Sequence, residues 1–207
     1  MSTERRLSPS EHSNRSWRIH EYAADFTLID AWVLPATGRR DEFADLYQIV
    51  VSLEPGADPG SASSRKLFAI RAWLGSRMGW DNPDVVNKLP LPGCNQSSLR
   101  ERLPPELAAT GGRMTERSNF RTVFEIENEA AFEVSNSLLH AIFHLGWVPQ
   151  TDGVYRGQMG VYVKHRGRAG PAYMAAIAPF RHHIVYPALL RRIESAWNTR
   201  TTAPIRT

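Results

Sequence analysis

The chain has 207 residues, of which 42% are hydrophobic and 22% are charged, with a net charge of +4. This composition is typical of a soluble globular protein, and no apolar run approaches the roughly 20 residues that a membrane-spanning helix requires. The polar N-terminus (MSTERRLSPSEHSNRS) lacks the apolar segment of a secretory signal, so we expect a cytoplasmic protein without a membrane span.

The excess positive charge lies near the two ends of the chain. It is carried by Arg5, Arg6, Arg15, Arg18, Arg191, Arg192, Arg200 and Arg206. Nucleic-acid-binding surfaces combine clustered basic residues with exposed aromatic side chains, and the sequence shows neither this combination nor a known motif. We therefore expect no nucleic-acid partner. The single cysteine, Cys94, excludes an internal disulfide and a multi-cysteine zinc site.

The first half of the chain predicts one strand, two helices and a long connector. Residues 1–17 and 199–207 lack hydrophobic periodicity, so we expect disordered tails around a single α+β domain over residues 18–198. Residues 18–34 mix aromatic and β-branched side chains and predict a strand that ends before Pro35. Three- and four-residue spacing predicts helices over residues 38–53 and 63–78. Residues 81–118 read as a connector with a short helical piece near residues 98–103, and connectors of this length are often functional.

From Phe120 the hydrophobic period changes to two, which is typical of strands with one buried face. The alternating segments cover residues 120–126, 129–134, 138–148 and 155–164, and short turns separate them. Short turns join neighbouring antiparallel strands, so the pattern predicts a four-stranded meander.

Residues 170–198 return to a helical period, with Pro179 and Pro187 inside the run. Each proline removes a backbone donor, so we expect kinked or consecutive helices. The predicted fold is therefore α+β: a curved antiparallel sheet, made of the meander and an N-terminal strand, packed on a long, proline-interrupted C-terminal helix.

The segment LLHAIFHLGWV (residues 138–148) places two histidines in an apolar run. In a helix, His140 and His144 would lie about 6 Å apart and could share a metal. In a strand they lie about 13 Å apart on one face, too far for a shared ion. The flanking turns favour the strand, so no metal site is expected.

The strand interpretation puts His140, Ile142 and His144 on one face and a larger apolar row, including Phe143 and Trp147, on the other. Either row could face the terminal helix. The residues that could meet an inward histidine row are Glu127, Glu133, Gln158 and Tyr162 on adjacent strands. A carboxylate beside a partly buried imidazole could form an acid–base pair. The alternative is that both histidines are hydrogen-bonded core or surface residues.

Other chemistry finds less support in the sequence. The chain has no GxSxG elbow, Walker loop, GxGxxG after a strand, or HExxH. Because adjacent helical positions diverge, one of His182 and His183 is expected to face solvent, and a structural role is favoured for this pair.

Several segments resemble the domain of unknown function 2867: SNSLLHAIFHLGWV, YRGQMGVYVKHRG and YMAAIAPFRHHIVYPALLRRIESAW, with LRERLPPEL and FRTVFEIENEAAFEVSN before them. The resemblance covers roughly residues 20–198. Such domains are similar to the helix-grip superfamily of birch-pollen-allergen-like, START and polyketide-cyclase-like proteins, in which a curved sheet grips a long helix around an apolar cavity. The resemblance defines no activity. In some relatives the domain follows a nucleotide-binding dehydrogenase-like domain; the sequence shows no such segment before residue 20, so we expect no dinucleotide and no other cofactor.

Three functions follow as hypotheses. The first is binding of a small apolar molecule, lipid- or polyketide-like, between the sheet and the C-terminal helix, with contacts from Phe124, Phe143, Trp147, Gln158, Tyr162, Tyr173, Ile177 and Phe180. The second is a cyclase- or dehydratase-like enzyme in which His140 or His144 exchanges a proton with Glu127 or Glu133. The third is a protein-interaction module that uses exposed aromatics such as Trp32 and Trp80. The sequence indicates neither the ligand's identity nor the oligomeric state.

Overall fold

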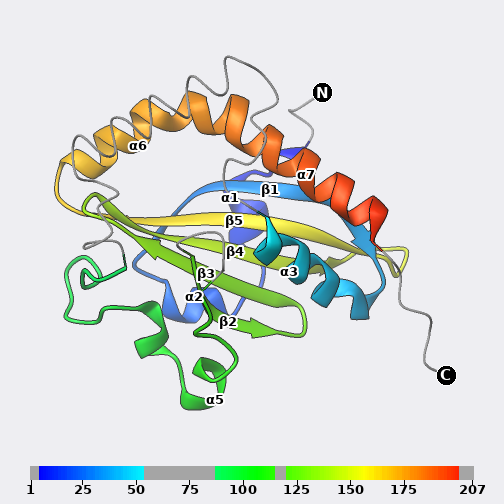
Figure 1. The fold of residues 1–207 in the computed structure, drawn as a ribbon, viewed down its shortest axis with the longest axis horizontal. Helices are drawn as coiled ribbons and strands as arrows, with labels where there is room; N and C mark the ends of the chain where they lie inside the picture. The colour runs from blue at the N-terminus through cyan, green and yellow to red at the C-terminus, as the bar shows by residue number, and fades with distance from the viewer. Residues whose placement is uncertain (1–4, 54–86, 115–119, 201–207) are drawn as a thin grey trace.

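The structure, a computed structural model, describes residues 5–53, 87–114 and 120–200. The helix expected over residues 63–78 and the aromatic Trp80 lie outside the described residues. A five-stranded antiparallel sheet forms the centre, the C-terminal helical run crosses one side of it, and α2 and α5 lie on the other side (Figure 1). The predicted α+β fold is confirmed.

The meander is present as predicted. Its strands are β2 (Arg121–Ile126), β3 (Glu129–Ser135), β4 (Leu139–Pro149) and β5 (Tyr155–His165). Each pairs antiparallel with the next, and β1 (Thr27–Gly38) adds to the outer edge of β5, which gives the order β1-β5-β4-β3-β2. The histidine-bearing segment is therefore the central strand of the sheet.

The N-terminal strand differs from the sequence prediction at both ends. Part of the predicted strand is the short helix α2 (Ile19–Tyr22), and β1 begins at Thr27 and continues through Pro35 to Gly38. Proline lacks the N–H that a central strand needs, but β1 is an edge strand and its register with β5 shifts between Val33 and Thr37. The position of β1 in the sheet therefore explains why Pro35 does not end it.

One face of the sheet is covered by α3 (Phe43–Ser52), which follows the 3-10 turn η2 (Arg40–Glu42), and by α7 (Tyr186–Thr199). The helix α7 buries Tyr186, Leu190, Ile193 and Trp197 at three- and four-residue spacing. They pack with side chains from α3 and the sheet, including Phe43, Leu46, Trp32, Phe132, Leu145 and Trp147. These residues form the core on the helix side of the sheet.

The C-terminal run is broken as predicted, at Pro187, whereas Pro179 lies inside α6 (Ala169–Phe180) and does not end that helix. The run is divided into α6, a π-helical turn η4 (Arg181–Val185) and α7. Pro187 has no N–H to offer the carbonyl of His183, so the regular α-helical ladder is broken there. The N–H of Tyr186 reaches instead to the carbonyl of Arg181, five residues back.

The opposite face carries a second core. Trp17, Ile19 and Phe26 from the N-terminal region pack with Leu91, Leu99 and Leu107 of the connector onto Phe124, Ile142 and Tyr162. The connector's helices are η3 (Leu99–Arg102), which matches the predicted short helical piece, and α5 (Pro105–Ala108). Among the described residues, no helix is long and apolar enough to cross a membrane.

The N-terminal segment is a further difference from the sequence prediction. Residues 5–17, here called the strap, were expected within a disordered tail, but they contain helix α1 (Pro9–Ser13) and lie against the sheet. The backbone of Arg6 forms an isolated antiparallel β-bridge with Trp32 at the outer edge of β1, and the side chains of Trp17 and His12 are buried. Two anchoring side chains do not produce a hydrophobic periodicity, which is why the sequence pattern missed this segment.

Candidate functional site

The two faces of β4 meet different neighbours. Leu145 and Trp147 point toward α3 and α7, whereas His140, Ile142 and His144 point toward the strap and the connector. The histidine row therefore lies on the side of the sheet away from the terminal helix. His140 is 1% exposed and His144 0% exposed, so the other protein segments cover both rings.

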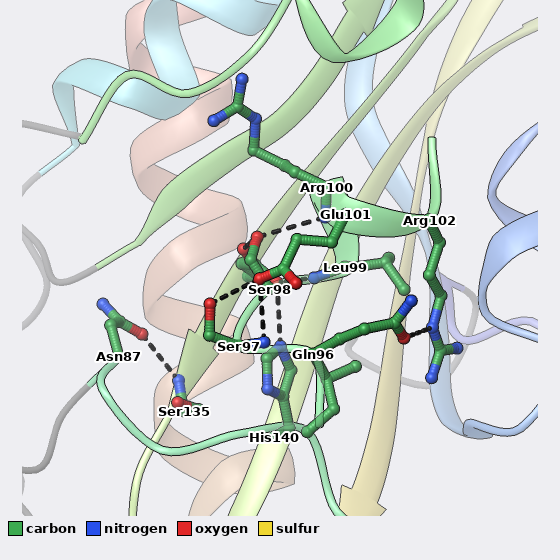
Figure 2. A network of polar contacts seen from close by, with 12 residues as sticks. Asn87, Gln96, Ser97, Ser98, Leu99, Arg100, Glu101, Arg102, Ser135 and His140 are labelled. Carbon is green, nitrogen blue, oxygen red and sulfur yellow. Dashed lines mark hydrogen bonds and ion pairs between the residues drawn. The ribbon is translucent and has the colours of Figure 1, made fainter. Parts of the chain in front are cut away.

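His140 joins a buried network at the base of the connector. Its Nε2 lies 3.0 Å from Oε2 of Glu133, and this carboxylate also accepts the hydroxyl hydrogen of Ser98 and, at 2.8 Å, the backbone N–H of Leu99. Figure 2 shows the connector residues Ser97, Ser98 and Leu99 beside His140, with Asn87 paired to Ser135 nearby. The contact between His140 and Glu133 that the sequence suggested is therefore formed in the structure.

Glu133 is held in its charged form by this network. Burial acts to raise its pKa, but the hydrogen bonds with His140, Ser98 and Leu99 outweigh burial, and the pKa of Glu133 lies below its usual value. Since a buried carboxylate is costly without partners, these donors are needed for the fold itself. The arrangement fastens the connector to β3 and β4.

His144 lies in a separate chain of polar contacts with the strap. Nδ1 of His12 lies 3.2 Å from Oε1 of Gln158, and Nε2 of His12 lies 3.1 Å from Nδ1 of His144. Burial, with a contribution from His144, lowers the pKa of His12 to about 3. A neutral His12 that donates to Gln158 accepts at Nε2, which makes Nδ1 of His144 the donor.

The glutamates of the sequence hypothesis separate in space. Glu129, not Glu127, approaches His144: its Oε1 lies 3.0 Å from Nε2, but the geometry of this contact is not that of a hydrogen bond. Glu129 also accepts the backbone N–H groups of Arg18 and Ile19 at the start of α2, both at 2.8 Å. Glu127 pairs instead with Arg40 at the surface. The structure does not bring Glu127 to either histidine.

The residues predicted to contact a ligand are divided between the two sides of the sheet. Phe124, Gln158 and Tyr162 lie on the histidine side, and burial together with Glu129 raises the pKa of Tyr162. Phe143 and Trp147 lie on the helix side. The α6 residues Tyr173, Ile177 and Phe180 are half-buried. These eight residues do not line one common site, and their role stays a prediction.

A polar cluster around Asp30, which the sequence did not predict, lies under the π-helical turn. Asp30, whose side chain is fully buried, comes from β1. Its Oδ1 is 2.6 Å from Nε2 of His182, and its Oδ2 accepts from Tyr186 Oη at 2.8 Å and from Arg181 Nη2 at 3.1 Å. Arg6 of the strap approaches Oδ1 to 3.7 Å.

The π-helical turn explains why three neighbouring side chains reach one carboxylate. A five-residue hydrogen-bonding step places residues 181 and 186 above one another, with 182 beside them, whereas a regular α-helix would spread the three further apart. His183 is exposed, so the expectation that one of the two histidines faces solvent is confirmed. π-helical turns are frequent at functional sites.

The Asp30 cluster has one member that can react with a molecule from solvent. The carboxylate of Asp30 is an acceptor, so Nε2 of His182 carries the hydrogen between them, and Nδ1 of a neutral ring keeps a free lone pair. The His182 side chain is 23% exposed. Burial and the neighbouring Asp30 raise the pKa of Tyr186, so its phenol stays a hydrogen-bond donor.

One sequence signal pointed to this cluster. Asp30 is the single charge in the apolar run TLIDAWVL, and a charge in a buried strand needs partners. The identity of those partners depends on the π-helical turn, which residue periodicity does not encode. Among the described residues, no three His, Cys, Asp or Glu side chains gather in a way that would hold a metal ion.

The fold and this cluster define an α+β protein with an open antiparallel sheet and an Asp–His pair beneath its C-terminal helix. The chain belongs to the family described as protein of unknown function (DUF2867), whose model matches residues 22–188. The match includes Asp30, Arg181, His182 and Tyr186, whereas the strap lies in front of it. No curated protein and no solved structure matches the chain, so the expected likeness to helix-grip proteins stays a prediction.

Proposed function

We propose that this protein binds a small, largely apolar molecule beside the π-helical turn and moves a proton on it, as cyclases and dehydratases do. The observation that carries the proposal is the 2.6 Å contact between buried Asp30 and partly exposed His182. A histidine held by a carboxylate and open to solvent is the usual arrangement of a general base. The acid–base class is retained from the sequence hypothesis, but the residues proposed for it are different.

In this proposal His182 is the catalytic residue and Asp30 positions it. Nδ1 of His182 takes a proton from a carbon next to a carbonyl group: the C–H bond breaks, its electron pair stays on the substrate as an enolate, and the ring becomes an imidazolium. The same nitrogen then returns a proton to the product. Asp30 holds the ring at Nε2, and its carboxylate is itself oriented by the hydrogen bonds that it accepts from Arg181 and Tyr186.

The surroundings of His182 support an apolar or aromatic substrate. Its ring stacks with Tyr186 at a centroid separation of 5.9 Å and lies 6.3 Å from the ring of Trp32. Both aromatics belong to the core between β1 and α7. The proposed binding position therefore lies between the sheet and the C-terminal helical run, where the sequence hypothesis also placed a ligand.

Hydrogen–deuterium exchange at carbon tests the proposal without knowledge of the natural substrate. The purified chain is incubated in D2O with 4-phenylbutan-2-one and with 2-oxo-4-phenylbutanoate, and proton NMR follows the signal next to the carbonyl. We expect exchange above the buffer rate, and we expect His182→Gln to lower it at least about 100-fold, the usual contribution of a general base.

Two variants separate catalysis from folding. His183→Gln changes the exposed neighbour and should leave the exchange rate unchanged. Asp30→Asn should lower the rate at least about tenfold while half-saturation changes less than about threefold, since a positioning residue acts on the chemical step. If both ketones bind but neither exchanges, the protein is a binding protein and the enzyme proposal fails. Equal exchange by wild type and His182→Gln would also overturn it.

A further inference from the structure

The polar groups around Asp30 also indicate which class of substrate fits the site. We propose that the substrate carries a carboxylate next to its reacting carbonyl group, and that Arg6 of the strap binds this carboxylate. The inference rests on the proposed function, because it assigns the specificity of the same site. Three observations carry it: the charge balance of the cluster, its unpartnered donors and the position of Arg6.

The cluster has more positive than negative charge. Two guanidinium groups, Arg6 and Arg181, approach the single carboxylate of Asp30 at 3.7 and 3.1 Å. The other contacts of that carboxylate are with His182 and Tyr186, and Tyr186 stays protonated. One negative charge on a substrate would therefore balance the cluster, and charge-assisted hydrogen bonds to an arginine are among the stronger polar contacts.

Two donors next to Asp30 have no acceptor among the described residues. The indole Nε1 of Trp32 and Nε of Arg181 are both buried without a hydrogen-bond partner. Trp32 is 3% exposed, and its ring lies 5.1 Å from that of Tyr186, which bonds to Asp30. Buried donors are normally paired, so unpaired donors beside a reactive group indicate a place for an acceptor on a ligand.

Arg6 is the member of the cluster best placed to bind an anion from solvent. At 3.7 Å its contact with Asp30 is too long for a hydrogen bond, and its side chain is 48% exposed. Its backbone is fixed by the bridge to Trp32 and by the adjacent bond from Leu7 N to Ala31 O at 2.9 Å. Within the part of the chain that the structure describes, the guanidinium of Arg6 thus keeps donors without an acceptor, on a fixed backbone beside Asp30.

The matched ketones of the exchange experiment also test this inference. 2-Oxo-4-phenylbutanoate and 4-phenylbutan-2-one differ by a carboxylate in place of a methyl group. Isothermal titration calorimetry should give an affinity at least about tenfold higher for the oxo acid, and Arg6→Gln should remove this preference while the affinity for the ketone stays within about twofold. Arg5→Gln, which changes the neighbouring strap arginine paired with Glu194, is the control.

The outcomes distinguish the two proposals. Exchange of both compounds with equal affinity would overturn the carboxylate inference and leave the acid–base proposal intact. Preferential binding of the oxo acid without exchange would support the anion site and overturn the acid–base proposal. An Arg6→Gln variant that keeps the preference would overturn the role of Arg6, and circular dichroism spectra of each variant establish that it is folded.

Discussion

At the scale of single residues, the buried polar groups of this protein fall into two kinds. His140, His144 and Glu133 are fully enclosed and bind the chain's own segments to the sheet. His182 is bound on one side by Asp30 and reaches solvent on the other. A buried polar group whose contacts are with the protein's own segments serves the fold, whereas an oriented group with an open side can serve chemistry.

The two glutamates named from the sequence should differ sharply in their contribution to stability. Glu133→Gln exchanges an acceptor-only carboxylate for an amide, which leaves one of the donors Ser98, Leu99 or His140 without an acceptor. We expect it to lower the free energy of unfolding by about 3 kcal/mol. Glu127→Gln removes a surface pair with Arg40 and should change it by less than about 0.5 kcal/mol. Urea unfolding measures both, and equal values would contradict the anchoring role of Glu133.

Gly160 should be required because of the ring that lies above it. A Cβ at this position would come within 2.5 Å of Nε2 of His12, so Gly160→Ala forces the strap away from β5. We expect a loss of about 2 kcal/mol in the free energy of unfolding. In a His12→Ala background the same substitution should cost less than half as much, since the ring is gone. Additive costs in this double-mutant cycle would show that His12 does not rest on Gly160.

At the scale of elements, the strap is a polar attachment as much as an apolar one. His12 seats its ring between Gln158 and His144, and Trp17 covers Gly146, where a Cβ would come within 2.4 Å of the indole. The strap also carries Arg6 to the Asp30 cluster on the other side of the sheet edge. Because the strap is attached through His12, which is neutral in the folded chain, protonation of this ring at low pH should weaken the attachment.

The free energy of unfolding should decrease as the pH is lowered below about 6.5. The unfolded chain binds a proton at His12 near pH 6.5, whereas the folded chain binds one only near pH 3, so stability from this group is complete above the first value and is lost as the pH falls. The maximum slope from one such group is about 1.4 kcal/mol per pH unit. His20, whose pKa burial also lowers, acts in the same direction. Unfolding in urea between pH 5 and 7.5 measures the slope.

The variant His12→Asn isolates the contribution of His12. It should reduce the loss of stability between pH 6.5 and 5 by about 1.6 kcal/mol relative to the wild type. His183→Asn, at the exposed neighbour of His182, is the matched control and should retain the wild-type slope. Identical slopes in all three proteins would mean that His12 titrates normally in the folded state.

At the scale of the whole molecule, the sheet is the middle of three layers. The sequence predicted the sheet, its strand order in the meander and the broken C-terminal helix, because each depends on local periodicity or on proline. It did not predict which face of β4 meets α7, since both rows of that strand are largely apolar. It also did not predict the third layer, because the strap and the connector attach through isolated anchors such as Trp17 and Leu99. The Asp30 cluster escaped for a similar reason: Asp30 is 151 to 156 positions away from Arg181, His182 and Tyr186, and it meets them only once β1 lies under the π-helical turn.

If the third layer is a true core, the two faces of β4 should contribute similarly to stability. Ile142 points toward the strap and the connector, Leu145 points toward α7, and both are 0% exposed. We expect Ile142→Ala and Leu145→Ala each to lower the free energy of unfolding by about 2–5 kcal/mol, the usual cost of a large buried cavity. Val154→Ala, in the exposed turn before β5, should cost less than about 0.5 kcal/mol.

Urea unfolding should be followed by both circular dichroism and tryptophan fluorescence, because coincident transitions show that both layers unfold with the sheet. A cost below about 1 kcal/mol for Ile142→Ala alone would mean that the strap and connector only rest on the sheet, and that α3 and α7 supply the stability of the fold.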